Sequence, residues 1–305
     1  MQNLIWYEKH RAKHLKELVL PIKTKKPLRS FLRQREIPHL LFHGPAGSGK
    51  TTVARILIDS CAGASLILNA SSSDRGVGTI KTRVKQFAAS KHQGDKLNVV
   101  LFDEADGLTA DAQMALKNTI ETYHSNCRFI FTANNFDHMI RPIVSRCVQL
   151  EFTNMDLVMV IGWAQNILDK EKIRYDKMDV DKIVKRFYPD MRTIVNNLQA
   201  CSIGGKFKIK NALSAFNRGG DIIKLLGKGD IRKIRQIIAG STDFVWLYRL
   251  LFEKFVNTCP DDIQPEIIVS IAEYLYRDRT VADREINFVA CLVDTANLLE
   301  TDITF

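Results

Sequence analysis

Short apolar runs alternate with helical stretches between residues 40 and 152. The runs are rich in Leu, Val, Ile and Phe and too short for helices; they are Leu40–Phe42, Leu66–Leu68, Val99–Phe102, Phe129–Phe131 and Val148–Phe152. Such runs are typical of strands in a parallel sheet, which helices bury on both faces. The pattern predicts an α/β fold with a doubly wound parallel sheet, whose ligand would lie beyond the carboxyl ends of the strands.

Beyond Thr153 the strand pattern stops, and apolar residues recur at helical spacing. The expected helices are Leu157–Asp169, Val180–Phe187, Arg192–Cys201, Lys210–Phe216, Ile231–Ile238, Phe244–Val256, Pro265–Tyr276 and Ile286–Leu299. Paired glycines at 204–205 and 219–220 punctuate this region. We therefore predict three domains: a sheet domain over residues 1–152, a small helical domain over 153–218, and an all-helical domain over 219–305.

A glycine-rich loop joins the first predicted strand to a helical pattern that begins near Thr52; its sequence is Gly44-Pro45-Ala46-Gly47-Ser48-Gly49-Lys50-Thr51. Small residues let successive backbone N–H groups surround a phosphate chain, and the helix behind them adds its positive end. Lys50 can reach the terminal phosphates, and the Thr51 hydroxyl can hold Mg²⁺. Strand, loop and helix together predict a P-loop that binds ATP with Mg²⁺ through residues 44–52.

A second motif stands where the strand Val99–Phe102 ends in acids. Asp103 would hold Mg²⁺, mostly through water, and Glu104 would orient or polarise an attacking water as general base. A strand that merely ends in solvated acids is the alternative. The P-loop earlier in the chain favours the catalytic interpretation.

The net charge and the cysteines indicate what kind of partner the protein binds and in which compartment it acts. Lys and Arg number 44 against 34 Asp and Glu, which gives a net charge of +10 and favours a polyanionic partner, nucleic acid or an acidic protein. The first 39 residues hold ten Lys and Arg against three Glu. The six cysteines lie scattered through apolar segments, without metal-ligand spacing, as reduced thiols of a cytoplasmic protein do. No segment is apolar enough to span a membrane, and no signal-peptide core follows Met1.

The acidic box Asp103-Glu104-Ala105-Asp106, with the P-loop before it and Ser145-Arg146-Cys147 after it, resembles the small ATPase subunits of sliding-clamp loaders, which belong to the AAA+ group. The resemblance extends over residues 1–217 at the level of motifs, and beyond them only as a helical tail of suitable length. It implies a P-loop ATPase domain, a helical lid, and a helical collar that joins subunits in a ring.

Other motifs support the same resemblance. The segment Trp6-Tyr7-Glu8-Lys9-His10-Arg11 is similar to the family's N-terminal box, usually Trp-x-Glu-Lys-Tyr-Arg-Pro, with His10 and Ala12 where Tyr and Pro are commoner. The motifs closest in look to the T-even phage type of subunit are Thr132-Ala133-Asn134-Asn135, Ser145-Arg146-Cys147 and Pro189-Asp190-Met191-Arg192.

For the nucleotide, the resemblance implies roles at single positions. Asn134 matches the sensor that holds a water near the γ-phosphate, with Thr132 as its support. Arg146 matches the arginine finger that is inserted in trans into the neighbouring subunit's site. Arg192 matches a second sensor on the lid. Glu8 and Arg11 of the N-terminal box would contact the nucleotide, and Asn69 would hold Glu104 away from water when DNA is absent.

For DNA, the candidates are Arg75 and the basic residues Lys81 and Lys85, which fall on one face of a helix expected to begin at Thr79 or Ile80. A helix start with basic residues binds a phosphate backbone without reading sequence. The alternative is an ordinary solvated charged face. Against the clamp or a neighbouring subunit, the family uses the region of Ala112, Gln113 and Met114, which core packing would explain equally well.

Taken together, the resemblance implies an ATP-dependent clamp-loader subunit of a hetero-oligomer, a pentamer in the family. It would open a sliding clamp, load it onto primer–template DNA, and release it when DNA stimulates hydrolysis. It would act at the replisome, in the host cytoplasm if viral. A rival enzyme is another AAA+ DNA-remodelling ATPase, such as a branch-migration helicase. A rival of another class is an ATP-binding scaffold that does not hydrolyse, which intact Thr51, Glu104 and Arg146 disfavour.

Overall fold

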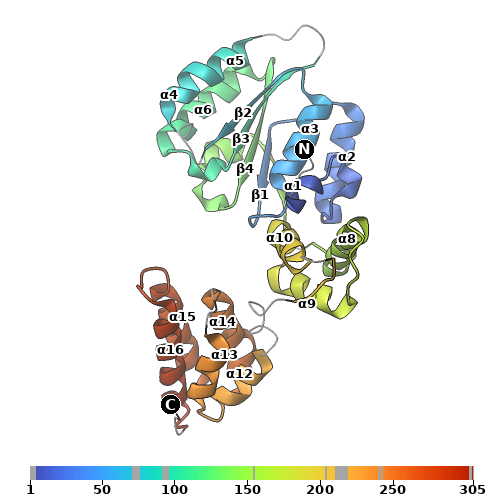
Figure 1. Cartoon of the computed structure of the whole chain (residues 1–305). Coiled ribbons are helices and arrows are strands. Elements are labelled where there is room, and N and C mark those ends of the chain that lie inside the picture. The colour runs from blue at the N-terminus through green and yellow to red at the C-terminus, as the bar shows by residue number, and fades with distance from the viewer. Residues whose placement is uncertain are drawn as a thin grey trace. The chain divides into compact units, whose positions relative to one another are not determined.

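A computed structural model describes residues 5–70, 76–90, 96–153, 155–202, 205–209, 219–239, 241, 243–301 and 304. Contacts divide the chain into two compact units, residues 1–208 and 209–305 (Figure 1). The predicted helix Lys210–Phe216 lies outside the described residues. The domain boundaries expected after residues 152 and 218 stay predictions, because contacts divide the chain once, after Lys208.

The N-terminal unit is built on a sheet of five parallel strands in the order β2-β3-β4-β1-β5. The strands are β1 (Leu40–His43), β2 (Ser65–Asn69), β3 (Asn98–Asp103), β4 (Cys127–Ala133) and β5 (Val148–Glu151). Each contains or overlaps one of the predicted apolar runs, so the α/β fold with a parallel sheet is confirmed. The P-loop follows β1, which lies between β4 and β5. Asp103 is the last residue of β3, on the other side of β4, so both lie at the carboxyl edge of the sheet.

Helices bury both faces of this sheet. They are α2 (Ile22–Gln34) and α3 (Lys50–Cys61) on one face, and α4 (Val77–Thr79), η3 (Ile80–Val84), α5 (Lys85–Ala89), α6 (Ala110–Tyr123) and α7 (Arg141–Val144) on the other. Alternate residues of β3 serve the two cores: Val99 and Leu101 join the first, Val100 and Phe102 the second. Burying each such side chain contributes roughly 1.5–3 kcal/mol, which explains why the strands are apolar throughout.

Three helices follow the sheet within the same unit: α8 (Leu157–Lys170), α9 (Lys177–Phe187) and α10 (Met191–Cys201). Each begins with an aspartate whose carboxylate accepts a backbone N–H of the first turn; these caps are Asp156, Asp176 and Asp190. Such caps stabilise a helix start by about 1 kcal/mol each. We call these three helices the lid helices. They match the three helices predicted for this part of the chain. The helix α9 begins three residues before its predicted start, and α10 begins one residue before.

The named elements among the described residues of the C-terminal unit are all helices. Its elements are α12 (Gly219–Leu226), α13 (Ile231–Ile238), α14 (Phe244–Leu250), η7 (Leu251–Phe255), η8 (Val256–Thr258), α15 (Gln264–Arg277) and α16 (Arg284–Leu298). The predicted helix Phe244–Val256 is split, because its second half winds as a π-helix. The core centres on Tyr248, whose ring meets Phe288 edge-on at 5.0 Å.

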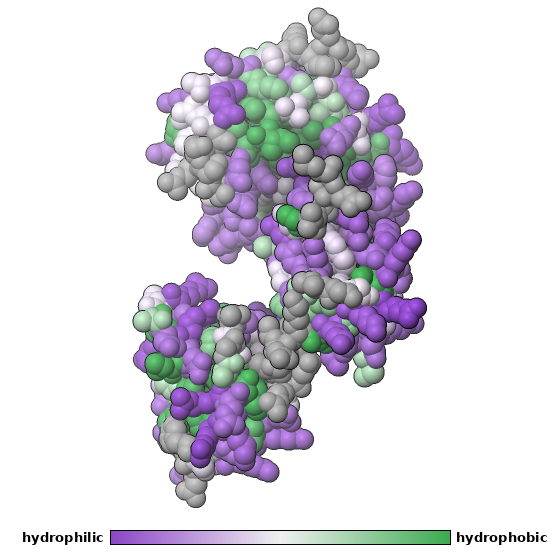
Figure 2. Space-filling model, viewed as in Figure 1, coloured by the Kyte–Doolittle hydropathy of each residue, from purple (hydrophilic) through white to green (hydrophobic). Residues whose placement is uncertain are grey.

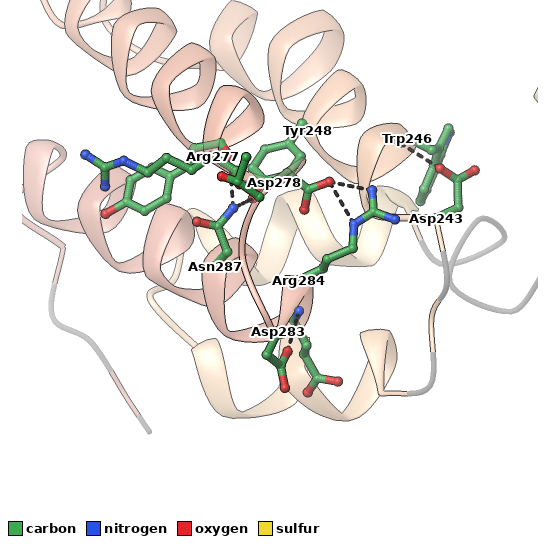
Figure 3. A network of polar contacts seen from close by, with 11 residues as sticks. Asp243, Trp246, Tyr248, Arg277, Asp278, Asp283, Arg284 and Asn287 are labelled. Atoms are coloured by element: carbon green, nitrogen blue, oxygen red, sulfur yellow. Dashed lines mark hydrogen bonds and ion pairs between the residues drawn. The ribbon is translucent and has the colours of Figure 1, made fainter.

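Hydrogen bonds stabilise the turn between α15 and α16 (Figure 3). Arg284 at the start of α16 donates from Nε to Oδ2 of Asp278, the C-cap of α15, at 2.8 Å. Asn287 donates to the Tyr248 hydroxyl at 2.8 Å and to the Tyr274 carbonyl at 2.9 Å. Burial raises the pKa of Tyr248 above its ordinary range, so the phenol stays neutral. The network is structural, since it provides partners for the buried side chains of Asn287 and Tyr248 and for one carboxylate oxygen of Asp278.

None of the described helices is long and apolar enough to cross a membrane. All six cysteines are free thiols; five are buried, and Cys147 is half-buried.

Candidate active site

The P-loop turns from β1 into α3 through backbone that favours glycine. Gly49, the N-cap of α3, has φ 93°, a left-handed value that costs most side chains strain. The turn lets α3 begin at Lys50, two residues before the predicted start. The first N–H groups of a helix lack partners within it, so this start is suited to hold phosphate oxygens.

Gly47 is required by a close approach of the lid helices. A Cβ built on Gly47 would lie 1.8 Å from Oδ1 of Asp190, and the Gly47 carbonyl accepts a 3.2 Å hydrogen bond from the Met191 N–H. Asp190 cannot easily move, because its carboxylate caps α10 by accepting from the Thr193 N–H at 3.0 Å. The start of α10 therefore rests directly on the phosphate-binding loop.

Lys50 is folded back against the protein and is 6% exposed. Its ammonium donates to the carbonyls of Gly44 and Pro45 at 2.8 Å each and to Oδ1 of Asn134 at 2.9 Å. Burial lowers the pKa of Lys50 to about 8, although the charges of Asp106 and Asp103 oppose the shift. A phosphate oxygen binding to this ammonium would exchange one acceptor for another, with little loss of hydrogen bonding.

Asp103, at the end of β3, accepts hydrogen bonds from two hydroxyl groups. Its Oδ1 accepts from Thr51 Oγ1 at 2.7 Å and from Thr132 Oγ1 at 2.6 Å. A hydroxyl beside a carboxylate offers the hard oxygen ligands that Mg²⁺ prefers, so Thr51 and Asp103 fit the metal role predicted for them. Mg²⁺ held there would neutralise charge that develops on transferring phosphate oxygens.

Glu104 has a backbone conformation that is rare for a side-chain-bearing residue. Its φ of 56° and ψ of 45° are left-handed, and its N–H donates to Thr132 Oγ1 at 3.0 Å. Thr132 thus orients Asp103 as donor and Glu104 as acceptor. Left-handed backbone at such a residue costs about 1 kcal/mol or more, and is found where a site needs a defined side-chain direction. Glu104 lines the same cavity as the P-loop.

Asp106 positions the loop after β4. Its Oδ2 accepts from the backbone N–H groups of Asn134 at 3.2 Å and Asn135 at 2.9 Å. Asn134 then presents its side-chain oxygen to Lys50. Oδ1 of Asp106 is buried without a hydrogen-bond partner among the described residues. The third acid of the box therefore acts on the site through the loop that carries Asn134.

One cavity joins these groups to the lid helices, with about 1020 Å³ of empty space including its open mouth. Its polar part is lined by the P-loop, the ends of β3 and β4, and one lid arginine; these residues are Ala46, Gly47, Ser48, Gly49, Lys50, Thr51, Thr52, Asp103, Glu104, Thr132, Asn134 and Arg192. The remaining wall is mostly apolar or aromatic; it consists of Tyr7, His10, Arg11, Ala12, Leu18, Val19, Trp163, Met191 and Val195. A polar end that suits phosphates and an apolar end that suits a flat base are what a nucleotide requires. Arg192 on α10 lies over the Tyr7 ring at 5.8 Å.

The N-terminal segment is fastened to the lid helices and their connections. The Trp6 N–H donates to Gln199 Oε1 at 2.9 Å. Nε2 of His10 lies 2.5 Å from Glu171 Oε1, and the Lys9 ammonium lies 2.7 Å from the same oxygen. Burial raises the pKa of Glu171, but hydrogen bonds from Lys9 and His10 outweigh it and lower the pKa below its ordinary value. We call this set of contacts the N-terminal clasp.

The predicted contacts from the N-terminal box differ in their placement. Arg11 lines the cavity, whereas Glu8 is not among its lining residues and pairs with Arg11 at 3.0 Å. The predicted P-loop residues Gly44 and Pro45 lie behind the cavity wall, where their carbonyls hold Lys50. Asn69 stands opposite Asp103 in the β2–β3 register, one residue from Glu104.

Arg146 lies away from this cavity. It pairs with Glu121 of α6, and its Nη1 donates to the Pro142 carbonyl at 2.7 Å. The side chain is partly exposed, with 29% of its surface open to solvent. This placement is compatible with a role in another subunit's site. Arg146 is not part of the wall of the cavity in its own chain.

The two lysines predicted for DNA, Lys81 and Lys85, are exposed on η3 and α5. The helical region begins at Val77, two or three residues before the predicted start, and winds as a π-helix over Ile80–Val84. Arg75 lies outside the described residues.

The predicted clamp or subunit contacts on α6 are mostly internal. Ala112 is fully buried, and the Gln113 side chain is buried with its amide donating to the His138 carbonyl and its oxygen accepting from the Ile140 N–H, both at 2.9 Å. Only Met114 is exposed, at 52%. Gln113 thus ties α6 to the loop before α7, because a buried amide must satisfy its hydrogen bonds internally, and direct contact is left to Met114.

Sequence reasoning did not assign roles to several residues of the site. Asp106, Asp190, Tyr7, Trp163 and Glu171 act through contacts with residues distant along the chain. Sequence indications existed for three of them: the acidic box for Asp106, the Pro189–Arg192 motif for Asp190, and the N-terminal box for Tyr7.

A parallel sheet with a P-loop after one strand and paired acids at the end of another is typical of a P-loop ATPase. Residues 40–155 match the family described as "ATPase family associated with various cellular activities (AAA)". The chain is 33% identical to replication factor C small subunit 1 of Pyrobaculum arsenaticum, over 96% of this chain and 94% of that protein. It is also 33% identical to the replication factor C small subunit of Sulfurisphaera tokodaii, over 97% and 96%. The chain therefore belongs to the replication factor C small-subunit family and is an AAA ATPase.

Among solved structures, a similar fold is found in a protein that is not a replication factor C subunit. The Thermotoga maritima RuvB Holliday junction branch migration motor aligns with a TM-score of 0.55 and 17% identity, over 75% of this chain and 85% of that chain. At this identity the likeness concerns the fold alone.

Proposed function

We propose that this chain is an ATP-hydrolysing subunit of a clamp loader. It binds ATP–Mg²⁺ between the P-loop and the lid helices, and in the ATP state it grips and opens a ring-shaped sliding clamp. Primer–template DNA then stimulates hydrolysis and releases the clamp around the duplex. Each step uses the different affinity of the ATP and ADP states for a partner.

The cavity carries this proposal, because every group that hydrolysis needs in cis faces one space. The P-loop and Lys50 would hold the phosphates, and Thr51 with Asp103 would hold Mg²⁺. Glu104 would take a proton from the attacking water, and Asn134 would hold that water. Arg192 would report the γ-phosphate to the lid helices.

An arginine finger would complete the site, in addition to the lining residues Arg11 and Arg192. We assign that role to Arg146 acting in trans, because the side chain is partly exposed and lies away from its own cavity. A finger supplied in this way is worth roughly 10³–10⁵ in rate. The ATPase would then depend on assembly with neighbouring subunits, as a hetero-oligomer.

For DNA, we assign Lys81 and Lys85, with Arg75, to contacts with the phosphate backbone. Both lysines are exposed and follow a helix start at Val77. For the clamp, we assign Met114 as the exposed residue of the α6 region. The names of the relatives, replication factor C small subunits, support action in DNA replication.

The decisive experiment measures ATP hydrolysis by the chain with its co-purifying subunits. Primer–template DNA and a candidate clamp are each added alone and together. We expect each to raise the rate, and the pair to raise it further. A rate that neither addition changes would contradict a clamp loader.

Branch migration is the second candidate, favoured by the fold likeness to RuvB. It predicts a closed hexamer and strand movement without any clamp. Electron microscopy of the assembly in ATP separates the two, since an open spiral fits only the loader.

A further inference from the structure

The basic excess of the N-terminal segment gathers on one helix. Residues 1–39 hold ten Lys and Arg against three Glu, and five of those ten cations lie on α2, which contains no acid. Two of the three acids are bonded elsewhere: Glu8 pairs with Arg11 at 3.0 Å, and Glu17 accepts from the Lys13 N–H at 2.8 Å. Most of the unbalanced charge of the segment therefore lies on α2, and the ATP site does not use it.

Three of these cations form a stripe on the exposed face of α2. Lys26, Arg29 and Arg33 follow one another at spacings of three and four residues, so they lie on one side of the helix, and all three are exposed. They span about 10 Å along the helix axis. The opposite face, with Leu28, packs in the core that includes α3. Within the described part of the chain, none of the three forms a salt bridge. We call these three residues the basic stripe.

The basic stripe works against the stability of its own helix. Arg29 lies three residues after Lys26 and four before Arg33, and like charges at these spacings destabilise a helix. Lys23, Lys25 and Lys26 lie near the start of α2, at the positive end of the helix dipole, where acids are favoured. Burial lowers the pKa of Lys25, and the charge of Arg29 lowers it further. An anion bound along the stripe would offset this repulsion, which helix stability alone does not explain.

The positive surface continues beyond the C-terminal end of α2. The residues that line a cavity there include Arg35, Lys96 and Arg128, against a single acid, Glu36. Arg35 and Lys96 are both exposed. Figure 2 shows hydrophilic residues over the side of the N-terminal unit where α2 lies. The basic stripe therefore belongs to a positive surface that is longer than the helix itself.

We infer that the basic stripe binds the phosphate backbone of duplex nucleic acid. Its cations follow one another about every 5 Å along the helix. Duplex DNA presents one negative charge about every 1.7 Å of its axis, so each cation can reach a phosphate without reading the base sequence. The helix α2 packs on one face of the sheet, and the helices that carry Lys81 and Lys85 pack on the other (Figure 1). The stripe is thus a second nucleic-acid surface, separate from the one assigned under the proposed function.

The side chains of α2 favour duplex nucleic acid over other polyanionic partners. Protein contacts depend on apolar anchors near their centre, and the one large apolar side chain exposed on α2 is Ile22, at its first residue. A membrane surface would need the apolar face of the helix, which is buried in the core. Single strands are held by stacking on aromatic rings, and the ring of α2, Phe31, packs against the core. A row of cations without anchors or rings suits a duplex backbone.

Salt-dependent binding of a short DNA duplex tests the basic stripe in the full chain. Fluorescence anisotropy is measured with Lys81→Ala and Lys85→Ala already in place, so that the other surface contributes little. Adding Lys26→Ala, Arg29→Ala and Arg33→Ala should weaken the remaining binding at least about tenfold. The slope of log affinity against log salt should fall by about 2.7, because each lost phosphate contact removes about 0.9. Two duplexes of unrelated sequence should behave alike.

Two controls separate the stripe from a general effect of charge. Arg29→Lys with Arg33→Lys should keep the slope, because lysine retains the charge that a phosphate contact needs. Three exposed lysines of the lid helices provide a variant of equal charge, whose affinity and slope should match the parent; its changes are Lys170→Ala, Lys177→Ala and Lys185→Ala.

A single substitution guards against a folding defect. Arg33→Gln, at an exposed position in the last turn of α2, should leave thermal unfolding unchanged and reduce the slope by about 0.9. An unchanged slope in both stripe variants, or an equal loss in the lid control, would overturn the inference. Duplex binding that persists while a co-purifying protein is lost would reassign the stripe to an acidic protein. An ATPase that neither DNA nor clamp stimulates would refute the proposed function and leave this inference standing.

Discussion

The Lys50 ammonium donates a 2.9 Å hydrogen bond to the side-chain oxygen of Asn134. The two residues are 84 positions apart: Lys50 begins α3 after the loop that follows β1, and Asn134 lies on the loop that follows β4. The strands β1 and β4 pair directly in the sheet. This bond links the start of α3, directly after the P-loop, to the loop that follows β4. It makes Asn134 part of the resting arrangement of Lys50 as well as a candidate ligand of the attacking water.

Replacing Asn134 with Ala should therefore affect the chemical step more than binding. We expect kcat to fall by roughly 10²-fold, because a group that positions water is worth about that much. The ATP Kd should change less than about threefold, since the P-loop is intact. Steady-state ATPase and equilibrium nucleotide titration measure the two quantities. Asn135→Ala is the matched control, because Asn135 caps a short helix and does not line the cavity. Equal losses in both quantities would make Asn134 a binding residue.

The lowered pKa of Lys50 predicts pH-dependent nucleotide binding. Its pKa of about 8 means that the ammonium loses its proton in the folded protein well below the pH at which it does so in the unfolded chain. ATP binds the charged form, so the Kd should rise as pH increases above about 8, by up to about tenfold per unit. Binding near pH 8.5 should take up a proton, which calorimetry in buffers of different ionisation enthalpy detects.

Lys50→Arg provides the control for this effect, because a guanidinium stays charged throughout the range. Its affinity should be lower but independent of pH between 7 and 9.5. The same shift has a consequence for stability. The unfolded chain binds more protons than the folded one above pH 8, so the free energy of unfolding of the nucleotide-free protein should rise with pH there. A Kd that is flat with pH in the wild type would contradict the assignment.

The role of Arg146 in trans predicts complementation between inactive variants. Arg146→Ala should bind ATP normally but lose roughly 10³-fold or more in turnover. Lys50→Ala should fail to bind ATP but still offer its Arg146 to a neighbour. Mixing the two should restore part of the ATPase, since some interfaces then join an intact P-loop to an intact arginine. No recovery, together with lost ATP binding in Arg146→Ala, would place Arg146 in its own site or in the fold.

The N-terminal clasp should contribute to nucleotide affinity through Glu171. Glu171→Gln removes the charge that holds His10 and Lys9, and His10 lines the cavity. We expect the ATP Kd to rise about threefold to tenfold while kcat changes little, because a partly buried pair contributes on the order of 1 kcal/mol. Lys9→Gln is the control: its side chain is 48% exposed, and the His10–Glu171 bond remains. If both variants matched the wild type, the clasp would have no part in binding.

Phosphate contacts on the helix after Val77 predict a change in salt dependence. Lys81→Ala should weaken DNA binding evenly across sequences and reduce the slope of log affinity against log salt by about 0.9. Fluorescence anisotropy over a range of salt concentrations measures this slope. Lys177→Ala at the start of α9 is a control of equal charge on another element. An unchanged slope would remove Lys81 from the DNA-binding residues.

The amino-acid sequence alone determined the parallel sheet and the chemical core of the site. Apolar runs marked the strands because parallel strands are buried on both faces. The P-loop placed Lys50 and Thr51 at a helix start, and the acidic box placed Asp103 and Glu104 at a strand end. These are local patterns, so spacing along the chain suffices to detect them. Most of the described helices after Thr153 followed from their apolar periodicity in the same way, although the one predicted over Phe244–Val256 is split.

Only the tertiary structure decided which distant residues complete the site. Spacing gives no reason for Gly47 to meet Asp190, for Asp106 to hold the loop of Asn134, or for Glu171 to hold His10. For Gln113 the sequence left a partner contact and core packing open, and the structure shows it buried, with its amide bonded to the backbone of the loop before α7. Such contacts depend on how elements pack, which the one-dimensional pattern does not contain.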